Sequence, residues 1–550
     1  MNCFEKVAQI LKNEGIEWIS CFPENQIINE AAKVGIRTVA FRHERGAVMA
    51  ADGYSRVQNR QNFGVVAVQS QAGAENSMGG IAQSFADNVP ILVLVKGVST
   101  NQISVTPNFS AVEKYRGWAK QVEAVYAPSQ INNVMRRAFH ALRNGKPGPV
   151  VVELTEDICE QEVPENAEIY NSPKISKIMP DKELIIECAQ KLLEAQNPMI
   201  WSGAGVISSE ATNELIKLAE LLSIPVFTTM PGKSSFDERH PLFLGSGCGT
   251  TTKAAHHWLV NSDLILALGT SLTRTPYGQK IPSGKYLIHN TINSNDINKD
   301  ENVDLGLLGD TKLTIIEIIL EIKNLTKNNN FQNNFSILKE IKEKRENWLN
   351  EWNATLNSDE VPISYYRVVN ELNKNLNLEE SIVTHDAGAP RDSMVPFFQA
   401  TLPNSYIGWG KTTHLGFGLP LIIGAKMAKK NKFCINIMGE GAFGMSGMDI
   451  ETAVRAKIPI TTIVLNNKSM ATYTGKTQGK IGKEAREIFG VSKMSGNYSK
   501  IADGLGAHSI TVTKPSELSI AIQKAKELNN SGVTVLIEVI AKVEEKRSRF

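Results

Sequence analysis

The sequence is poor in cysteine, has no long apolar run and carries almost no net charge. Six scattered cysteines in 550 residues lack the paired spacing of a metal site, so we expect reduced thiols and a cytoplasmic location. The longest apolar runs fall well short of the roughly 20 residues that a membrane helix needs. The 59 Lys and Arg nearly balance the 57 Asp and Glu, and a net charge of +2 provides no field that attracts nucleic acid or anionic membranes.

The first residues lack the features of a secretion signal. Residues 1–19 have no basic start, no long apolar core and no small-residue cleavage site, so we expect no signal peptide. Neither nucleic acid nor a membrane is therefore expected as a partner, which leaves small molecules and other protein chains.

The sequence does contain ample apolar material, arranged in short runs. Hydrophobic residues make up 42% of the chain, and the length predicts several domains at about 100–200 residues each. Apolar runs without polar alternation are separated by helix-period stretches, which predicts parallel sheets covered by helices on both faces. The predicted strands are Val65–Val68, Ile91–Val95, Val150–Leu154, Met199–Trp201, Val226–Phe227, Leu264–Leu268, Lys285–Ile288, Ile382–Thr384, Phe433–Met438, Ile460–Leu465 and Val533–Val539.

Two polar segments divide the chain. Residues 163–182 contain three prolines and residues 324–336 are rich in asparagine, so both suit surface linkers. We therefore predict three α/β domains with doubly wound parallel sheets, at 1–162, 180–325 and 360–545.

The most specific motif lies in the last of these units. An apolar strand ends at Met438 and is followed by Gly439-Glu440-Gly441, a helix, and a second apolar strand that ends at Asn466-Asn467. A βαβ crossover of this kind brings both strand ends to the carboxyl edge of the sheet, where such sheets bind ligands. A carboxylate and a carboxamide there suit Mg²⁺ holding a diphosphate. A tight turn without a ligand is the alternative interpretation of Gly-Glu-Gly alone.

This pair of motifs resembles the fingerprint of the thiamine-diphosphate enzymes of the acetolactate synthase and 2-oxo-acid decarboxylase superfamily. The resemblance implies thiamine diphosphate and Mg²⁺ as cofactors, with the metal held by the side chains of Glu440 and Asn467 and the carbonyl of Ser469. It further implies that the following residues lie beside the cofactor: Gly439, Gly441, Ala442, Phe443 and Met470.

One position departs from the fingerprint. Glu440 stands where the family usually has Asp, and Mg²⁺ tolerates little distortion of its octahedral shell. Weaker or altered metal binding is one consequence that we expect, and a relative without cofactor is another.

Two further segments resemble the family. Glu44 precedes a helix of small residues on which another element can pack closely. A Glu at a helix start is usually a surface cap, but the resemblance makes Glu44 the catalytic group that binds the aminopyrimidine of thiamine. In the segment 406–425, the resemblance makes Leu415 the apolar side chain that bends the cofactor by lying between its two rings. It also implies that the backbone carbonyl of Thr413 accepts a hydrogen bond from the amino group of the cofactor.

The substrate and a flavin are less well defined by the sequence. Phe109 and Lys120 match synthase residues and Arg391 is a further candidate for binding substrate, but the loop after Lys96 lacks the synthase arginine and Glu156 replaces a lysine. The resemblance raises FAD as a third cofactor in the middle unit, where the segment from Asn290 to Asn293 replaces the paired aspartates of the synthases and Asn293 can still hydrogen-bond a ribose or adenine. A polar cluster without ligand is the alternative.

The resemblance also implies an assembly. In this family the cofactor lies between the first domain of one subunit and the last domain of another, which predicts a homodimer or a dimer of dimers. Three functions remain open at this point. They are a carboligase resembling acetolactate synthase, a lyase or decarboxylase that acts on a 2-hydroxyacyl-CoA or a larger 2-oxo acid, and a non-catalytic relative.

Overall fold

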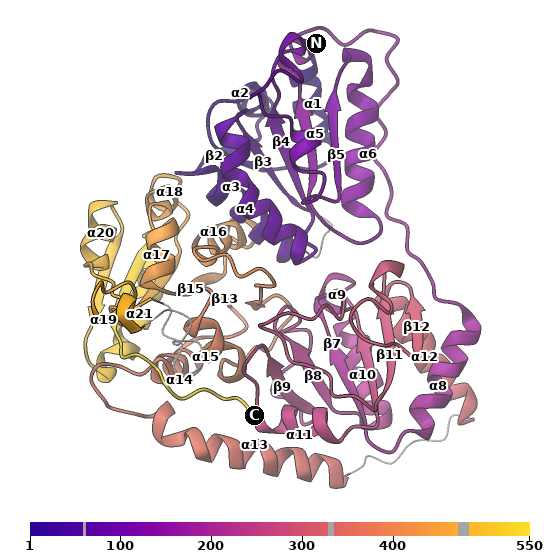
Figure 1. The fold of residues 1–550 in the computed structure, drawn as a ribbon, viewed down its shortest axis with the longest axis vertical. Coiled ribbons are helices and arrows are strands. Elements are labelled where there is room, and N and C mark those ends of the chain that lie inside the picture. Colours follow the sequence, from indigo (N-terminus) through magenta and orange to yellow (C-terminus); the bar gives the residue numbers. More distant parts are fainter. Residues whose placement is uncertain (59–61, 328–334, 471–482) are drawn as a thin grey trace.

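The computed structural model describes residues 1–58, 62–327, 335–470 and 483–550. It contains three parallel six-stranded sheets, each flanked by helices, and they follow one another along the chain (Figure 1). This confirms the predicted fold class. Residues 328–334, part of the predicted second linker, lie outside the described residues, and the exact domain boundaries stay a prediction.

The first sheet has the strand order β2-β1-β3-β4-β6-β5. All residues of β3, β4 and β6 are buried, which explains why these strands show no polar alternation. The strands are β1 (Trp18–Cys21), β2 (Arg37–Ala40), β3 (Gly64–Val68), β4 (Ile91–Lys96), β5 (Gln121–Val125) and β6 (Val150–Leu154). The helices are α1 (Cys3–Asn13), α2 (Gln26–Lys33), α3 (Glu44–Arg56), α4 (Ala72–Ala86), α5 (Ala111–Lys114), α6 (Ile131–Arg143) and α7 (Glu156–Cys159).

The second sheet has the order β12-β11-β10-β7-β8-β9. Strands β7 to β9 are added toward one edge of the sheet and β10 to β12 toward the other, so the strand order reverses between β7 and β10, as in dinucleotide-binding folds. Its strands are β7 (Pro198–Ser202), β8 (Val226–Thr229), β9 (Phe243–Gly247), β10 (Leu264–Leu268), β11 (Tyr286–Thr291) and β12 (Leu305–Leu308). Its helices are α8 (Lys182–Glu194), α9 (Ala204–Ser208), α10 (Thr212–Leu222), α11 (Lys253–Asn261) and α12 (Thr311–Leu325).

The third sheet has the order β14-β13-β15-β16-β18-β17, which repeats the topology of the first. Its strands are β13 (Ser381–His385), β14 (Tyr406–Ile407), β15 (Phe433–Gly439), β16 (Thr461–Asn466), β17 (His508–Val512) and β18 (Val535–Ile540). Its helices are α13 (Phe335–Leu356), α14 (Tyr365–Asn375), α15 (Ala389–Phe397), α16 (Gly418–Ala428), α17 (Glu440–Ser446), α18 (Asp449–Arg455), α19 (Lys483–Glu487), α20 (Tyr498–Gly504) and α21 (Leu518–Asn530).

Helices α3 and α16 join the first and third domains. A Cβ at Gly53 would overlap the carbonyl oxygen of Leu421, and a Cβ at Gly424 would overlap that of Ala50, so the two backbones touch. One hydrophobic core runs through both helices. The expectation that another element packs closely on the small residues after Glu44 is thus confirmed.

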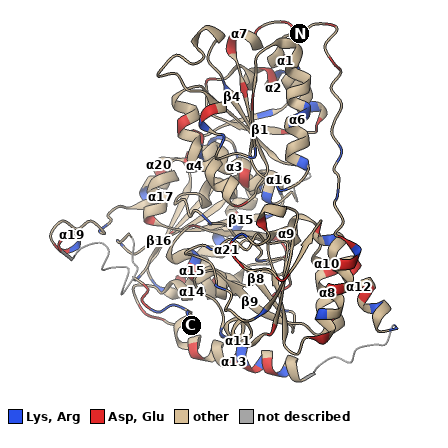
Figure 2. Ribbon diagram, turned by 45° about the vertical axis from the view of Figure 1, so that its right-hand side comes forward, with Lys and Arg blue, Asp and Glu red and all other residues tan. Residues whose placement is uncertain are grey.

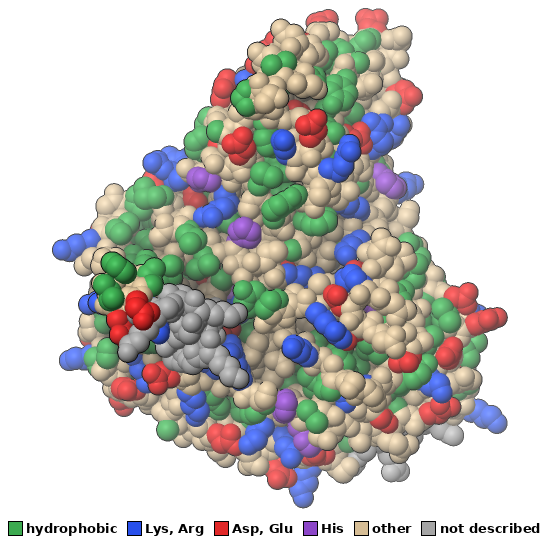
Figure 3. All heavy atoms as spheres, viewed as in Figure 1, with side chains coloured by type: hydrophobic (Ala, Val, Ile, Leu, Met, Phe, Trp, Pro, Cys, Tyr) green, Lys and Arg blue, Asp and Glu red, His purple; other side chains and the backbone are tan. Residues whose placement is uncertain are grey.

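The surface carries charges of both signs. Acidic and basic side chains are interspersed over the outer helices (Figure 2), and the face in Figure 3 shows no continuous region of one sign. Among the described residues, no helix is long and apolar enough to cross a membrane. All six cysteines are buried free thiols.

Candidate active site

The residues predicted to hold a metal converge at the carboxyl edge of the third sheet. Glu440 begins α17 directly after β15, and Asn467 follows β16, the next strand in the sheet. The backbone N–H of Ser469 donates to Glu440 Oε1 and to Asn467 Oδ1, at 2.9 Å in each case. Two side-chain oxygens from different elements are therefore directed to one point. Burial raises the pKa of Glu440, although backbone N–H groups around it favour the carboxylate.

The glycines beside this cluster leave space. A Cβ at Gly439 or at Gly444 would meet no atom within 4 Å, whereas a Cβ at Gly441 would lie 3.1 Å from the Met470 sulfur. Ala442 and Phe443 are buried in α17, and the Phe443 ring packs edge-on against Tyr498 with 5.4 Å between ring centroids. Met470 is held by a backbone hydrogen bond to Ser492. Space thus lies open beside Gly439, at the start of α17.

Asp386 organises the turn that carries Leu415. It follows β13, and its carboxylate accepts hydrogen bonds from the backbone N–H groups of Gly416 and Gly418, at 3.1 and 2.9 Å. Burial raises the pKa of Asp386 to about 6 against these hydrogen bonds. Leu415 is half-buried and packs against the core, and Thr413 adopts a left-handed backbone with φ of 55°. Non-glycine residues in this region are strained and are frequent at ligand sites.

Glu44 lies at the carboxyl edge of the first sheet. It is 2% exposed, and its Oε2 accepts a hydrogen bond of 3.1 Å from Asn76 Nδ2 on α4. A Cβ at Gly73 would come within 3.0 Å of Glu44 Oε1, so the glycine-rich start of α4 allows the approach. The carboxyl is therefore buried and is not the surface cap of the alternative interpretation.

Comparison with known proteins decides the family. The chain matches three domain models: the N-terminal thiamine pyrophosphate (TPP) binding domain at residues 1–124, the central domain of these enzymes at 185–318, and the C-terminal TPP binding domain at 386–539. The chain belongs to the thiamine pyrophosphate enzymes. It is thus a TPP-dependent enzyme of transferase or lyase type, and TPP is another name for thiamine diphosphate.

Relatives of this TPP enzyme cover nearly its whole length. It is 28% identical to a probable acetolactate synthase large subunit of Methanococcus aeolicus, over 96% of this chain and 90% of the relative. It is 26% identical to the acetolactate synthase large subunit of Haemophilus influenzae, over 97% and 94%. A putative thiamine pyrophosphate-containing protein of Bacillus subtilis is also 26% identical, over 98% and 91%.

The residues of this TPP enzyme fit the metal that the family implies. Hard oxygen ligands on a carboxylate and a carboxamide suit Mg²⁺, and they already converge beside glycines that leave room for a diphosphate. The helix that starts at Glu440 has seven residues.

The three candidate substrate residues lie in different places. The backbone N–H of the buried Phe109 donates to Gln71 Oε1 at the edge of the first sheet. The Lys120 ammonium donates to the carbonyls of Ala141 and Asn144 at the end of α6, where a cation stabilises the helix. Arg391 is 2% exposed and binds Asp392, with its guanidinium 4.8 Å from the centroid of the Tyr277 ring. The structure does not bring them together.

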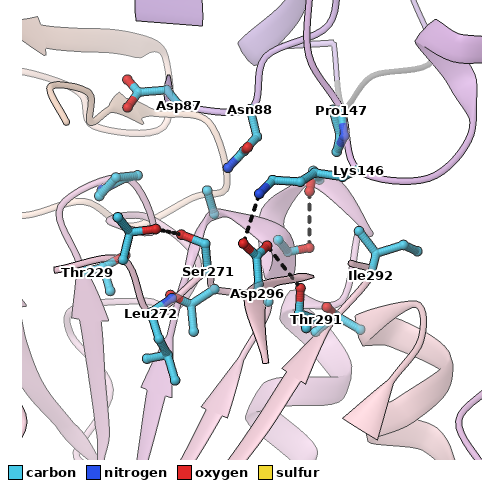
Figure 4. Close-up of a pocket in the computed structure, with 18 of the residues that line it drawn as sticks. Asp87, Asn88, Lys146, Pro147, Thr229, Ser271, Leu272, Thr291, Ile292 and Asp296 are labelled. Atoms are coloured by element: carbon cyan, nitrogen blue, oxygen red, sulfur yellow. Dashed lines mark hydrogen bonds and ion pairs between the residues drawn. The ribbon is translucent and has the colours of Figure 1, made fainter. Parts of the chain in front are cut away.

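A cavity of about 270 Å³ lies at the carboxyl edge of the second sheet (Figure 4). Its lining includes Asp296, whose Oδ1 lies 2.9 Å from Lys146 Nζ of the first domain, and Lys411 of the third, whose Nζ donates to Ser271 Oγ at 3.0 Å. Burial opposes ionisation of Asp296, but Lys299 and Lys146 outweigh it and lower its pKa. Thr291 and Asp296, rather than the predicted Asn293, belong to this lining.

The sequence analysis did not identify three residues of these sites. Asn76 binds Glu44, Asp386 holds the turn before α16, and Tyr365 accepts a hydrogen bond from Asn467. In the sequence, the glycine-rich turn before Asn76 and the strand end before Asp386 are both features that indicate a ligand-binding edge of the sheet. Nothing near Tyr365 in the sequence indicates its contact with a residue 102 positions away.

Proposed function

We propose that this TPP enzyme is a carboligase resembling acetolactate synthase, which joins two 2-oxo acids with loss of CO₂, such as two pyruvates to 2-acetolactate. The observation that carries the proposal is the convergence of Glu440 and Asn467 on Ser469, together with the near full-length match to acetolactate synthase large subunits.

The chain's own residues divide the work between two domains. Glu440, Asn467 and the Ser469 carbonyl are to hold Mg²⁺ and, through it, the diphosphate. Thiamine diphosphate, when bound, supplies the nucleophilic carbon and accepts the electron pair left by CO₂. Leu415 is to force its two rings into a bent arrangement, and the carboxyl of Glu44 is to exchange a proton with the aminopyrimidine ring. Burial of Glu44 keeps this carboxyl away from bulk water.

We further infer that two chains complete each site. In one chain α3 and α16 run in opposite directions, since Gly53 faces Leu421 while Ala50 faces Gly424. Arg45, the residue after Glu44, donates to the Met445 carbonyl of α17, so the start of α3 borders the third domain in one chain. The recorded contacts of the Glu44 carboxylate itself stay in the first domain. A homodimer, or a dimer of dimers, supplies Glu44 from the neighbouring chain.

One observation favours a second candidate, a lyase or decarboxylase for a substrate other than pyruvate. At the carboxyl end of β4, Lys96 Nζ lies 2.9 Å from Glu156 Oε1 and 3.2 Å from Glu24 Oε1. The two carboxylates outweigh the one ammonium, so this edge disfavours the carboxylate of a small 2-oxo acid.

The cavity at the second sheet is a candidate site for FAD. Its support is the dinucleotide-type strand order and the polar lining at the carboxyl strand ends. Flavin absorbance of the purified protein, and flavin fluorescence after acid release, test this directly. Reconstitution that leaves no bound flavin would contradict it.

The proposed reaction is tested with purified protein, pyruvate, thiamine diphosphate and Mg²⁺. Release of CO₂ with formation of acetolactate is the expected result. Cofactor binding without turnover of pyruvate would favour the second candidate, and no cofactor binding would favour a non-catalytic relative. Glu44→Ala is expected to abolish turnover and keep the cofactor, while Glu17→Ala, exposed at the opposite edge of the same sheet, retains activity.

A further inference from the structure

Tyr365 lies directly behind the candidate metal ligand Asn467. It is the first residue of α14, is 2% exposed, and its hydroxyl oxygen accepts a hydrogen bond of 2.7 Å from Asn467 Nδ2. The helix α14 is separate from β15 and β16, the two strands that carry the candidate metal ligands. It is therefore a third element that touches the site from the interior of the domain.

Two contacts together fix which end of the carboxamide faces the candidate metal position. A carboxamide has an oxygen that accepts and a nitrogen that donates hydrogen bonds, and only the oxygen ligates Mg²⁺. Asn467 donates through Nδ2 to Tyr365, and its Oδ1 accepts from the Ser469 N–H at 2.9 Å. If the amide were rotated by half a turn, its NH₂ group would face the Ser469 N–H and the second contact would be lost. The Ser469 N–H thus selects the ligating orientation, and the tyrosine oxygen holds the NH₂ end of the carboxamide in it.

The backbone of Tyr365 is itself held in place. Glu544, 5% exposed, accepts hydrogen bonds through Oε1 from the Tyr365 N–H at 3.0 Å and from Ser364 Oγ. Just before this, Ile363 exchanges backbone hydrogen bonds with Ile540 and Lys542 at the end of β18. The start of α14 is therefore tied to the chain segment that leaves the third sheet, and the hydroxyl has little freedom to move.

We propose that Tyr365 is a positioning residue that fixes the Asn467 carboxamide for a divalent cation, and that Glu544 holds Tyr365 in that position. This inference rests on the proposed function, since it requires the metal site. It assigns Tyr365 no contact with the cofactor or the substrate.

The hydroxyl acts as a neutral partner. Burial and the nearby Glu440 carboxylate raise the pKa of Tyr365 above its ordinary value, so the side chain adds no charge at neutral pH. A loss of the hydroxyl therefore removes an orienting contact while the charge of the site stays the same.

The test compares Tyr365→Phe with Tyr366→Phe. Both tyrosines are 2% exposed and adjacent in α14, but the Tyr366 hydroxyl donates to the Lys546 carbonyl at 2.8 Å. Mg²⁺ affinity is measured by calorimetric titration in the presence of thiamine diphosphate, and Mn²⁺ binding by electron paramagnetic resonance. Tyr365→Phe is expected to weaken binding about 10-fold or more, as outer-shell substitutions do. Tyr366→Phe is expected to leave it unchanged.

Thermal unfolding without metal separates positioning from folding. Both variants lose one buried hydroxyl and are expected to shift similarly, and excess Mg²⁺ is expected to restore turnover in Tyr365→Phe. Wild-type metal affinity in Tyr365→Phe, or equal weakening in Tyr366→Phe, would overturn the inference while the proposed function stands. A wild-type protein that binds neither metal nor cofactor would overturn both.

Discussion

Glu440 has one methylene more than the aspartate of the family fingerprint, and the structure shows where the longer side chain reaches. Its Oε1 and the Asn467 Oδ1 both lie 2.9 Å from the Ser469 nitrogen, so the carboxylate already converges with the second candidate ligand. The backbone position of Glu440 and the length of its side chain are therefore matched to one another.

We accordingly predict that Glu440→Asp, which restores the usual family residue, weakens Mg²⁺ binding. The shorter side chain withdraws the carboxylate by about one C–C bond, roughly 1.5 Å, and Mg²⁺ tolerates little distortion. A Mg²⁺ titration at saturating thiamine diphosphate is expected to show a loss of about 10-fold or more. Equal or tighter binding by Glu440→Asp would show that the backbone adapts to either length.

Asp449 gives a prediction about pH. It begins α18, is 2% exposed, and its Oδ1 accepts from the Arg42 N–H of the first domain at 3.0 Å. Burial raises the pKa of Asp449 to about 6. Because the folded state binds this proton more tightly than the unfolded state, the contribution to stability is present below about pH 4 and is lost as pH rises through about 6.

Asp449→Asn removes this titration. The free energy of unfolding is expected to fall less between about pH 4 and about pH 7 in Asp449→Asn than in the wild type, with a difference on the order of 2 kcal/mol. Thermal unfolding at both pH values measures it, with the exposed Glu17→Gln as control. An unchanged pH dependence in Asp449→Asn would contradict the raised pKa.

At the residue scale, the sequence predicts the ligand types but not their surroundings. Glu440 and Asn467 stand at strand ends, and a strand end is visible as the last residue of an apolar run. Asn76 and Tyr365 reach the site through tertiary contacts with residues 32 and 102 positions away, and no local pattern indicates such a contact.

At the scale of elements, the central strands are predictable and the edge strands are not. The strands without a predicted counterpart are β1 and the two outermost strands of each sheet, namely β2, β5, β9, β12, β14 and β17. Central strands of a parallel sheet are buried on both faces and read as apolar runs. The edge strand β17 is only partly buried, whereas β9 is buried but contains two glycines.

The contact of α3 with α16 gives a prediction at this scale. Gly424→Ala would place a Cβ against the Ala50 carbonyl, which neither backbone can avoid without separation of the helices. We expect a loss of about 1–3 kcal/mol or more, seen as a lower unfolding temperature. Gly504→Ala in α20, where a Cβ meets no atom within 4 Å, is the control and is expected to be neutral. Equal stability of the two variants would contradict the packing.

At the scale of the whole molecule, the first and third domains share one topology, and each carries candidate cofactor residues at its carboxyl edge. Glu44 stands on one and Glu440 on the other, and the recorded contacts of Glu44 within the described chain lie in its own domain. The proposed dimer unites one half from each chain.

A mixture of two inactive variants tests this arrangement. Glu44→Gln and Glu440→Gln are each expected to be inactive, but a mixed dimer has one site that carries both changes and one that carries neither. After mixing and subunit exchange, activity should return to about one quarter of the wild-type level if the dimers form at random. No recovery in verified mixed dimers would place both residues in a site formed by one chain.

The most direct test of the central claim, that Glu44 activates a cofactor held at Glu440 and Asn467, is the exchange rate of the C2 proton of bound thiamine diphosphate in deuterated water. In the wild type and in the control Glu17→Gln the exchange is expected to be fast. In Glu44→Gln with cofactor and Mg²⁺ still bound, it is expected to slow by about 100-fold or more. Exchange at the wild-type rate in Glu44→Gln would contradict the account.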